Sequence, residues 1–293
     1  MPSGPGLIES DGDMGKDITI YEVGPRDGLQ SASLQLSIEQ KVDMIALLAD
    51  SGLERIEVGS FVHPKRVPNM ADSDEVYRRV ADLDCELSVL VPNKRGLERA
   101  QSVGATKFNV FLSPSNAFNR NNLNLELDEI LSAYKEMLYG IPKDDIRVYI
   151  SHAFGCPIEG EISTDILTKT ITQSSLLGNN VVMCDTVGLA NAEIISKTLE
   201  LTDGIRANWA LHLHHNYKVH EKIFDNVQAG YDFGIRQFDS SIAGLGGCPF
   251  SPGSGANLAT EGLVRWAEKN NIDAGISSTD LTDVLSFVRG LYC

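Results

Sequence analysis

Residues 210–214, Ala210-Leu211-His212-Leu213-His214, alternate apolar and histidine side chains, and an amphipathic segment follows them. Residues i and i+2 of a strand point to the same face, so His212 and His214 are expected to project together from one strand end. Two neighbouring imidazoles suit a divalent metal ion. A pair of solvated or hydrogen-bonded histidines at a strand end is the alternative, and the spacing alone leaves both interpretations open.

This stretch is one of eight short β-rich runs that alternate with helical patterns along the chain. The strands are expected at 18–23, 55–58, 87–91, 107–112, 147–152, 180–184, 210–214 and 237–240. The helices are expected at 37–51, 73–82, 94–102, 125–139, 163–177, 192–202, 219–231 and 258–270. Eight strands, each followed by a helix, predict an α/β fold, a TIM (β/α)8 barrel. An open doubly wound sheet is the alternative, but no GxGxxG motif follows the first strand.

The chain of 293 residues is expected to fold as a single barrel domain over residues 17–293. Residues 1–16 are rich in Gly, Ser, Pro and Asp and are expected to form a disordered tail. Residues 273–293 carry a helical pattern, which predicts a short C-terminal helical extension. No apolar run approaches the ~18 residues of a membrane span, so no membrane partner is expected.

The composition limits the classes of binding partner and the cellular environment that we expect. A formal net charge of −15 argues against nucleic acid as a partner, although a local basic patch can still bind an anionic small molecule. The five cysteines are scattered and form no CxxC pair, which predicts a reduced, cytoplasmic setting. We expect a small-molecule substrate and a homo-oligomer, a dimer or larger.

Polar side chains follow several of the expected strands. They are Glu22, Arg26 and Asp27 after the first strand, Glu57 near the end of the second, and Cys248 and Asn257 after the eighth. Active sites of such barrels lie where the strands end and the βα loops begin. Because the first, seventh and eighth strands are neighbours in a closed barrel, these residues are expected to meet His212 and His214 at one mouth.

Asp27 would add a carboxylate to the two imidazoles, and Asn257 could add an amide oxygen. This donor set suits Mn, Mg, Zn, Fe or Co, and the lack of a thiolate pair argues against a structural zinc site. Each residue also has a simpler interpretation. Asp27 lies in a Pro-Arg-Asp-Gly turn of the kind common on surfaces, and Asn257 could be a helix N-cap.

Other residues have open roles. Arg26 could stabilise an enolate oxygen or be a surface charge. Cys248, in a Gly-rich segment, could be an acid, a nucleophile or an exposed thiol. His152, at the end of the fifth strand, is expected to be a core histidine with a satisfied ring, and Asp185 could line the mouth.

Three segments resemble the 3-hydroxy-3-methylglutaryl-CoA lyase family, a group of metal-dependent TIM-barrel lyases and aldolases. They are residues 22–30 (EVGPRDGLQ), 56–67 (IEVGSFVHPKRV) and 239–257 (DSSIAGLGGCPFSPGSGAN). The resemblance covers residues 18–270. Its most specific motif is the Gly-rich segment with its cysteine, whereas the Arg-Asp pair and the H-x-H spacing occur across the wider group.

The resemblance implies a divalent cation, Mg or Mn, bound by Asp27, His212, His214 and Asn257. It implies that Arg26 contacts a thioester carbonyl, that Cys248 lies on a mobile loop and protonates an enolate, and that Glu57 matches a family carboxylate near the metal. The implied reaction cleaves a 3-hydroxy-3-methylglutaryl-CoA-like 3-hydroxyacyl-CoA into acetyl-CoA and a 3-oxo acid, acetoacetate, by metal-assisted retro-Claisen or aldol chemistry. Basic residues after the second and third strands are candidates for the CoA phosphates: Lys65, Arg66, Lys94 and Arg95.

The chain departs from the lyase pattern in two places. Residues 30–33 read QSAS where lyases read Gln-Asn-Glu, and residues 215–218 read HNYK where lyases read Asp-Thr-Tyr-Gly. His-His-Asn is similar to bacterial aldolases that cleave 4-hydroxy-2-oxo acids, but those place a catalytic histidine where this chain has Leu29-Gln30. Such an aldolase, and a catalytically inactive metal-binding barrel, are therefore the alternatives.

Overall fold

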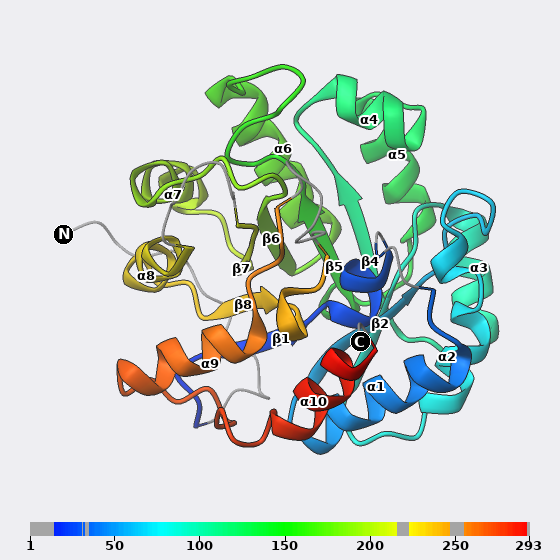
Figure 1. Cartoon of the computed structure of the whole chain (residues 1–293). Helices are drawn as coiled ribbons and strands as arrows, with labels where there is room; N and C mark the ends of the chain where they lie inside the picture. The colour runs from blue at the N-terminus through cyan, green and yellow to red at the C-terminus, as the bar shows by residue number, and fades with distance from the viewer. Residues whose placement is uncertain (1–14, 31, 33–34, 216–222, 247–254, 292–293) are drawn as a thin grey trace. The chain divides into compact units, whose positions relative to one another are not determined.

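The computed structural model describes residues 15–30, 32, 35–215, 223–246 and 255–291. Its strands form one closed barrel in the order β1 to β8, so the predicted (β/α)8 fold is confirmed (Figure 1). The strands are β1 (Thr19–Glu22), β2 (Arg55–Ser60), β3 (Glu86–Leu90), β4 (Lys107–Leu112), β5 (Ile146–Ile150), β6 (Asn180–Asp185), β7 (Asn208–Leu213) and β8 (Gln237–Ser240).

Helices follow the strands as predicted. They are α1 (Ile38–Asp50), α2 (Ser73–Val80), α3 (Lys94–Ser102), α4 (Asn116–Leu123), α5 (Leu127–Met137), α6 (Thr164–Leu177), α7 (Ala192–Leu199), α8 (Ile223–Phe233), α9 (Thr260–Lys269) and α10 (Thr282–Gly290). The predicted C-terminal extension is helical over α10, which buries Val284, Leu285 and Val288. Within the described ranges, no helix combines the length and the apolar character needed to cross a membrane.

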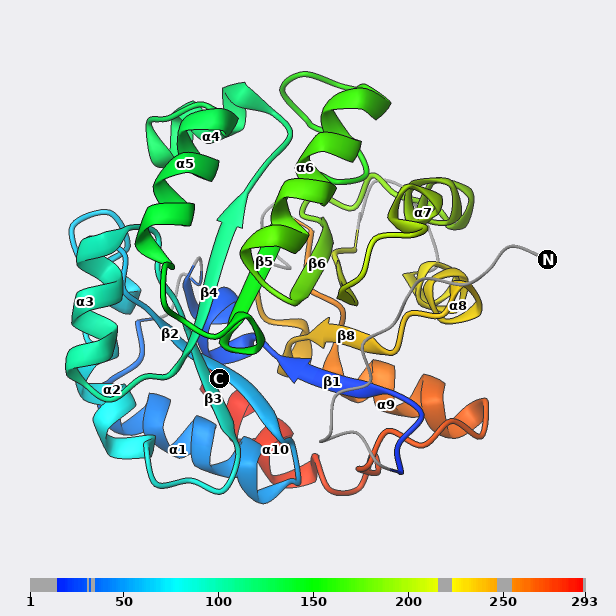
Figure 2. The ribbon, with the colours of Figure 1, turned by 180° about the vertical axis from the view of Figure 1, so that it is seen from behind.

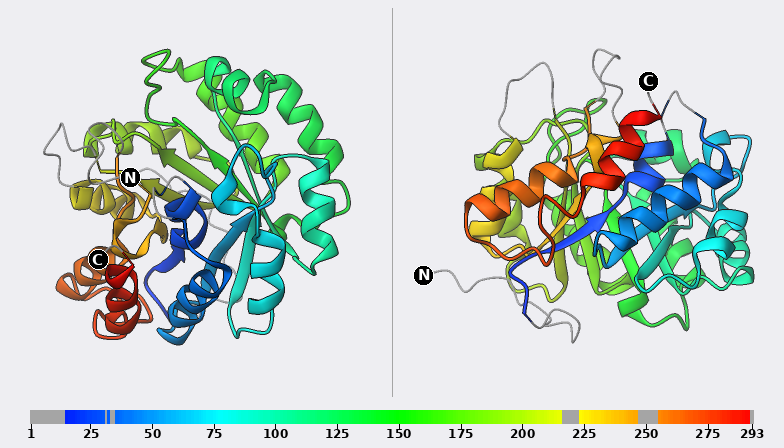
Figure 3. Two further views of the ribbon diagram at one scale, coloured as in Figure 1. Left: turned by 45° about the vertical axis from the view of Figure 1, so that its right-hand side comes forward. Right: turned by 60° about the horizontal axis from the view of Figure 1, so that its bottom comes forward.

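Contacts divide the chain into two compact units. One contains Asn109–Gln237, and the other contains Asp13–Phe108 and Phe238–Cys293. In the second unit, α10 packs against α1 (Figures 1 and 3). In the first unit, α7 packs against α8 beside β6 and β7 (Figure 2).

Parallel strand pairing determines which residues of neighbouring strands lie side by side within each unit. In the first unit, Cys184 of β6 is level with His212 of β7. In the second, Glu22 of β1 is level with Ile56 of β2, which precedes Glu57. Parallel neighbours need a crossover between them, and the helices supply it.

Two predicted helix starts are confirmed. Ser37 forms a capping box with Gln40 at α1, and Ser163 accepts a hydrogen bond from the backbone N of Ile166 at α6. α4 was not predicted because its sequence, NAFNRNNL, is rich in asparagine, a weak helix former. It forms because Ser115 caps its first turn through the backbone N of Phe118.

The fifth strand is shorter than predicted. β5 ends at Ile150, and His152, expected in the strand, has a left-handed φ of 60°. The strand stops there because a left-handed residue cannot continue the extended backbone. The prediction of a strand up to residue 152 is therefore wrong by two residues.

Candidate functional site

The segment after β1 is a single π-helical turn over Gly24–Gly28, a form that is frequent at functional sites. The carbonyl of Val23 accepts hydrogen bonds from the backbone N of Asp27 at 2.7 Å and of Gly28 at 3.3 Å. This wide turn presents the side chains of the two adjacent charged residues, Arg26 and Asp27, from a fixed backbone.

Arg26 is the centre of a buried charge cluster in the second unit. Its side chain is almost fully buried, Nε donates to Oε2 of Glu57 at 2.5 Å, and Nη1 donates to Oδ1 of Asp27 at 2.6 Å. Glu57 is fully buried. Two carboxylates thus fix the orientation of one guanidinium, which rules out the alternative of a surface charge for Arg26.

Asn257 belongs to the same cluster. Its Nδ2 donates to Oδ2 of Asp27 and to the carbonyl of Leu245, both at 2.8 Å. Gly246, with φ of 114°, leaves the space for this amide, because a Cβ there would collide with Nδ2. α9 is capped at Ala259, so Asn257 is not its N-cap. The amide instead ties the segment after β8 to Asp27.

Glu22 is a buried carboxylate whose role was not predicted. It accepts hydrogen bonds from the backbone N of Gly24 at 2.8 Å, the backbone N of Ile242 at 2.9 Å and Oγ1 of Thr260 at 2.5 Å. Complete burial raises its pKa from 4.5 to about 7, although these hydrogen bonds oppose the shift. Glu22 joins the segments after β1 and β8 through one side chain.

His212 and His214 form the predicted pair in the first unit. Both are buried, their Nε2 atoms are 2.9 Å apart, and their ring centroids are 4.9 Å apart. The prediction that the two rings project together is confirmed. Burial excludes solvated histidines, and the 2.9 Å separation is compatible with the hydrogen-bonded form of the alternative. Tyr149 packs edge-on against the His212 ring at 6.1 Å.

Asp185 ends β6 beside this pair. Its carboxylate accepts hydrogen bonds from the backbone N of Leu189 at 2.8 Å and of Ala190 at 2.9 Å. Burial raises its pKa, whereas its backbone hydrogen bonds and the charge of His212 lower it. Asp185 therefore anchors its own loop and interacts electrostatically with His212.

His215 is half-buried, and burial lowers its pKa.

A carboxylate with two imidazoles matches the donors that divalent metals take in proteins. The first unit supplies the two imidazoles of His212 and His214, and the second unit supplies the carboxylate of Asp27. The two Nε2 atoms 2.9 Å apart fit a cation, because both nitrogens can then act as lone-pair donors. Cys248, predicted to be catalytic, lies outside the described residues.

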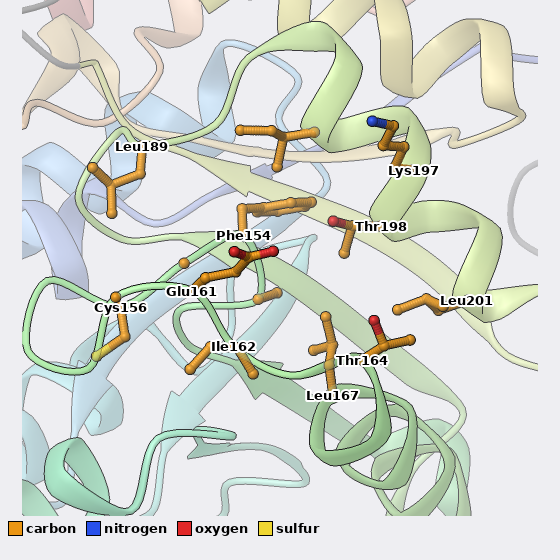
Figure 4. A pocket seen from close by; sticks show the side chains of 14 residues that line it. Phe154, Cys156, Glu161, Ile162, Thr164, Leu167, Leu189, Lys197, Thr198 and Leu201 are labelled. Carbon is orange, nitrogen blue, oxygen red and sulfur yellow. The ribbon is translucent and has the colours of Figure 1, made fainter.

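A cavity of about 500 Å³ lies elsewhere in the first unit, beside α6 and α7 (Figure 4). Phe154 lies across it, and Glu161 and Lys197 lie on its border (Figure 4). None of the predicted site residues lines this cavity. The predicted chemistry therefore does not depend on it.

A family model described as HMGL-like matches residues 17–288. The chain belongs to the HMGL-like family. A hydroxymethylglutaryl-CoA lyase of Pseudomonas mevalonii is 39% identical over 253 residues, which are 84% of this chain and 83% of the relative. The predicted family is thereby confirmed.

Solved structures agree with this assignment to the HMGL-like family. A hydroxymethylglutaryl-CoA lyase of Pseudomonas aeruginosa superposes with a TM-score of 0.85 at 31% identity, over 94% of this chain and 93% of that one. An HMG-CoA lyase of Acinetobacter baumannii, in complex with coenzyme A and 3-methylmalate, superposes with a TM-score of 0.82 at 31% identity, over 97% and 93%.

Proposed function

We propose that this HMGL-like chain is a divalent-metal-dependent carbon–carbon lyase. Its substrate is a 3-hydroxyacyl-CoA like 3-hydroxy-3-methylglutaryl-CoA, and its products are acetyl-CoA and a 3-oxo acid, acetoacetate. The similarity to lyases of that name supports the substrate class. The observation that carries the proposal is the close approach of two buried imidazole nitrogens at the end of β7.

Asp27, His212 and His214 are the proposed protein ligands of Mg or Mn, with Asn257 as a further oxygen donor. The C-terminal ends of all strands of a parallel barrel open at one face. Asp27 follows β1, His212 and His214 lie at the end of β7, and Asn257 follows β8. A bound cation would polarise the substrate hydroxyl and lower its pKa. Asn257 also orients Asp27 through the hydrogen bond between them.

Arg26 is the proposed anion-stabilising group. When the hydroxyl on C3 gives its proton to a base at the site, C3 becomes a ketone, the C2–C3 bond breaks, and its electrons form a thioester enolate. A guanidinium held by Glu57 and Asp27 would donate to the enolate oxygen without reorganising. Glu57 acts here through Arg26, and Asp27 and His212 complete the proposed catalytic set beside the hydroxyl.

Cys248 is the proposed acid that protonates C2 of the enolate, which yields acetyl-CoA. We expect Cys248→Ser to reduce turnover about 10²-fold or more, the usual contribution of a general acid, while metal binding is retained. Metal affinity by calorimetry together with kcat tests this role. A variant that keeps wild-type turnover would remove Cys248 from the mechanism.

CoA binding is the second part of the proposal. Lys65 and Arg66 after β2 and Lys94 and Arg95 after β3 are exposed basic residues in an acidic chain. Such a local patch suits the phosphates of CoA. An HMG-CoA lyase at 31% identity has been solved with coenzyme A bound, which supports this assignment.

A substrate panel tests the function. Purified protein with added Mg or Mn is offered 3-hydroxyacyl-CoAs and 4-hydroxy-2-oxo acids, and the products are identified by mass spectrometry. Release of acetyl-CoA supports the proposal. Release of pyruvate instead favours the aldolase alternative, and a metal-binding protein that releases neither product is the inactive barrel.

The setting and assembly complete the proposal. Among the described residues, Cys85 and Cys156 are free thiols, which agrees with a reduced, cytoplasmic setting. We further propose a homo-oligomer, a dimer or larger, which light scattering of the purified chain tests directly.

A further inference from the structure

His152 is a buried histidine in an unusual backbone conformation at the end of β5. Its φ is 60°, in the left-handed region that few non-glycine residues adopt, and it is only 3% exposed. Residues held in this way cluster at functional sites, where the surrounding structure determines the conformation. The left-handed residue also breaks the alternation of the strand and redirects the ring.

The ring lies beside a rigid loop. Phe118 packs edge-on against it, with ring centroids 4.4 Å apart. Nδ1 of His152 is 3.5 Å from Oγ of Ser113, a long and weak contact. Asn119 holds Ser113 in place, because its side chain accepts from the backbone N of Ser113 at 2.9 Å and donates to the backbone carbonyl at 2.7 Å.

These contacts bear on the position of the ring proton. Oγ of Ser113 accepts a hydrogen bond from the backbone N of Ser115 at 3.1 Å and can donate its own hydrogen to Nδ1 of His152. An accepting Nδ1 puts the ring proton on Nε2. Among the described residues, Ser113 is the side-chain hydrogen-bond partner of the His152 ring, and the backbone carbonyl of His152 accepts from the backbone N of Gly155, so a proton on Nε2 has no protein acceptor there.

The ring is also uncharged. Burial lowers the pKa of His152 to about 4, so the imidazole is neutral at physiological pH. A neutral N–H donor beside an aromatic ring suits a neutral acceptor, such as an amide carbonyl oxygen. A carboxylate would instead pair best with a charged donor such as Arg. The expectation of a core histidine is confirmed for its burial, while a proton on Nε2 would have no acceptor among the described residues.

The position of His152 is suited to substrate contact. The backbone N of Ala153, the next residue, donates to the carbonyl of Cys184 at 3.1 Å, and Cys184 is level with His212 in the neighbouring strand. The ends of β5, β6 and β7 thus lie side by side in one unit. His152 follows β5 at the same end at which His212 and His214 lie.

We propose that His152, with Ser113, forms a subsite that donates a hydrogen bond from Nε2 to an amide carbonyl oxygen of the pantetheine arm of the acyl-CoA. This inference rests on the proposed function. There, the thioester oxygen and the oxygens of the acyl group are already assigned to Arg26 and the cation. The two amides of the pantetheine arm are the neutral carbonyl acceptors that remain near the reacting bond.

His152→Asn tests the subsite, because asparagine tolerates the left-handed backbone but is too short to replace Nε2. We expect an unchanged melting temperature, KM for 3-hydroxy-3-methylglutaryl-CoA raised about tenfold, Kd for CoA alone raised by the same factor, and kcat changed less than about twofold. Ser113→Ala is expected to act in the same direction with a smaller effect, since it removes only the group that orients the ring.

Truncated substrates distinguish this contact from a structural role. With the n-butyl thioester of the same acyl group, which has no amide, the variant and the wild type are expected to have equal KM. The N-acetylcysteamine thioester, which has one amide, identifies the amide that is bound. An equal loss with the butyl thioester, or no change with CoA, overturns the inference. A wild-type protein that neither binds CoA nor releases acetyl-CoA overturns the proposed function as well.

Discussion

The Arg26 region of one unit and the His212 region of the other handle buried charge in opposite ways. Around Arg26, opposite charges are paired, since two carboxylates hold one guanidinium at hydrogen-bond distance. Around His212, the two imidazole rings contact each other, and Tyr149 packs against the His212 ring. Burial raises the pKa of Asp185, which favours the neutral form of its carboxyl group. The first region pairs a guanidinium with two carboxylates, and the second has imidazole nitrogens directed at each other.

The difference indicates a division of labour. A paired guanidinium of fixed orientation can stabilise a new negative charge at once, which is what enolate formation needs. Two imidazole nitrogens 2.9 Å apart form a stable arrangement when a cation or a shared proton lies between them. Variants in each region should therefore fail in different ways.

The largest effect is expected for the proposed metal ligands. Asp27→Ala or His212→Ala should reduce turnover to below about one-thousandth of wild type, because the substrate hydroxyl is then no longer activated. Metal binding by calorimetry should be lost in parallel. The matched control is Asp128→Ala, which removes an exposed ion pair with Lys169 and should leave turnover unchanged. Wild-type metal affinity in either ligand variant would contradict the assignment.

The charge pairing predicts the next effect. Glu57→Gln removes one of the two carboxylates that contact the buried guanidinium of Arg26. Breaking a buried ion pair typically costs about 3 kcal/mol in the free energy of unfolding. Urea unfolding measures this loss. Glu39→Gln, which breaks an exposed pair with Arg79, should cost less than about 1 kcal/mol, and equal costs would show that burial is irrelevant here.

Glu22 predicts a pH dependence. Its pKa rises from 4.5 in the unfolded chain to about 7 in the fold, so the folded chain binds more protons between these values. The stabilisation is complete below pH 4.5 and is lost as the pH rises through 7, by an amount on the order of 3 kcal/mol. Glu22→Gln mimics the protonated form and should lack this slope. Urea unfolding from pH 4.5 to 8 compares the two chains, and identical slopes would contradict the raised pKa.

The smallest effect is expected at the surface. Lys94→Ser with Arg95→Ser should raise KM for the acyl-CoA about three- to tenfold without changing kcat, because exposed charges steer and hold phosphates weakly. Steady-state kinetics at low and high salt measure it. The paired control, Arg78→Ser with Arg79→Ser, changes the net charge equally, and an equal rise in KM there would show that only the overall charge matters.

The alternation of side chains and the number of strand–helix units account for the features that the sequence predicted. Alternation at residues 210–214 placed His212 and His214 on one face, and eight alternating units predicted the barrel. The contact between Arg26 and Glu57 could not be predicted, because it depends on the register of β1 against β2 and on the π-helical turn. The left-handed backbone of His152 was not predicted either, because residues 147–152 have the pattern of one continuous strand.

The most direct test measures acetyl-CoA release from 3-hydroxy-3-methylglutaryl-CoA by protein from which divalent cations have been removed with a chelator, before and after Mg or Mn is added back. The proposed lyase should release no acetyl-CoA in the stripped state and should recover with either cation, whereas Asp27→Ala should not recover. Full release by the stripped protein would contradict the metal-dependent lyase.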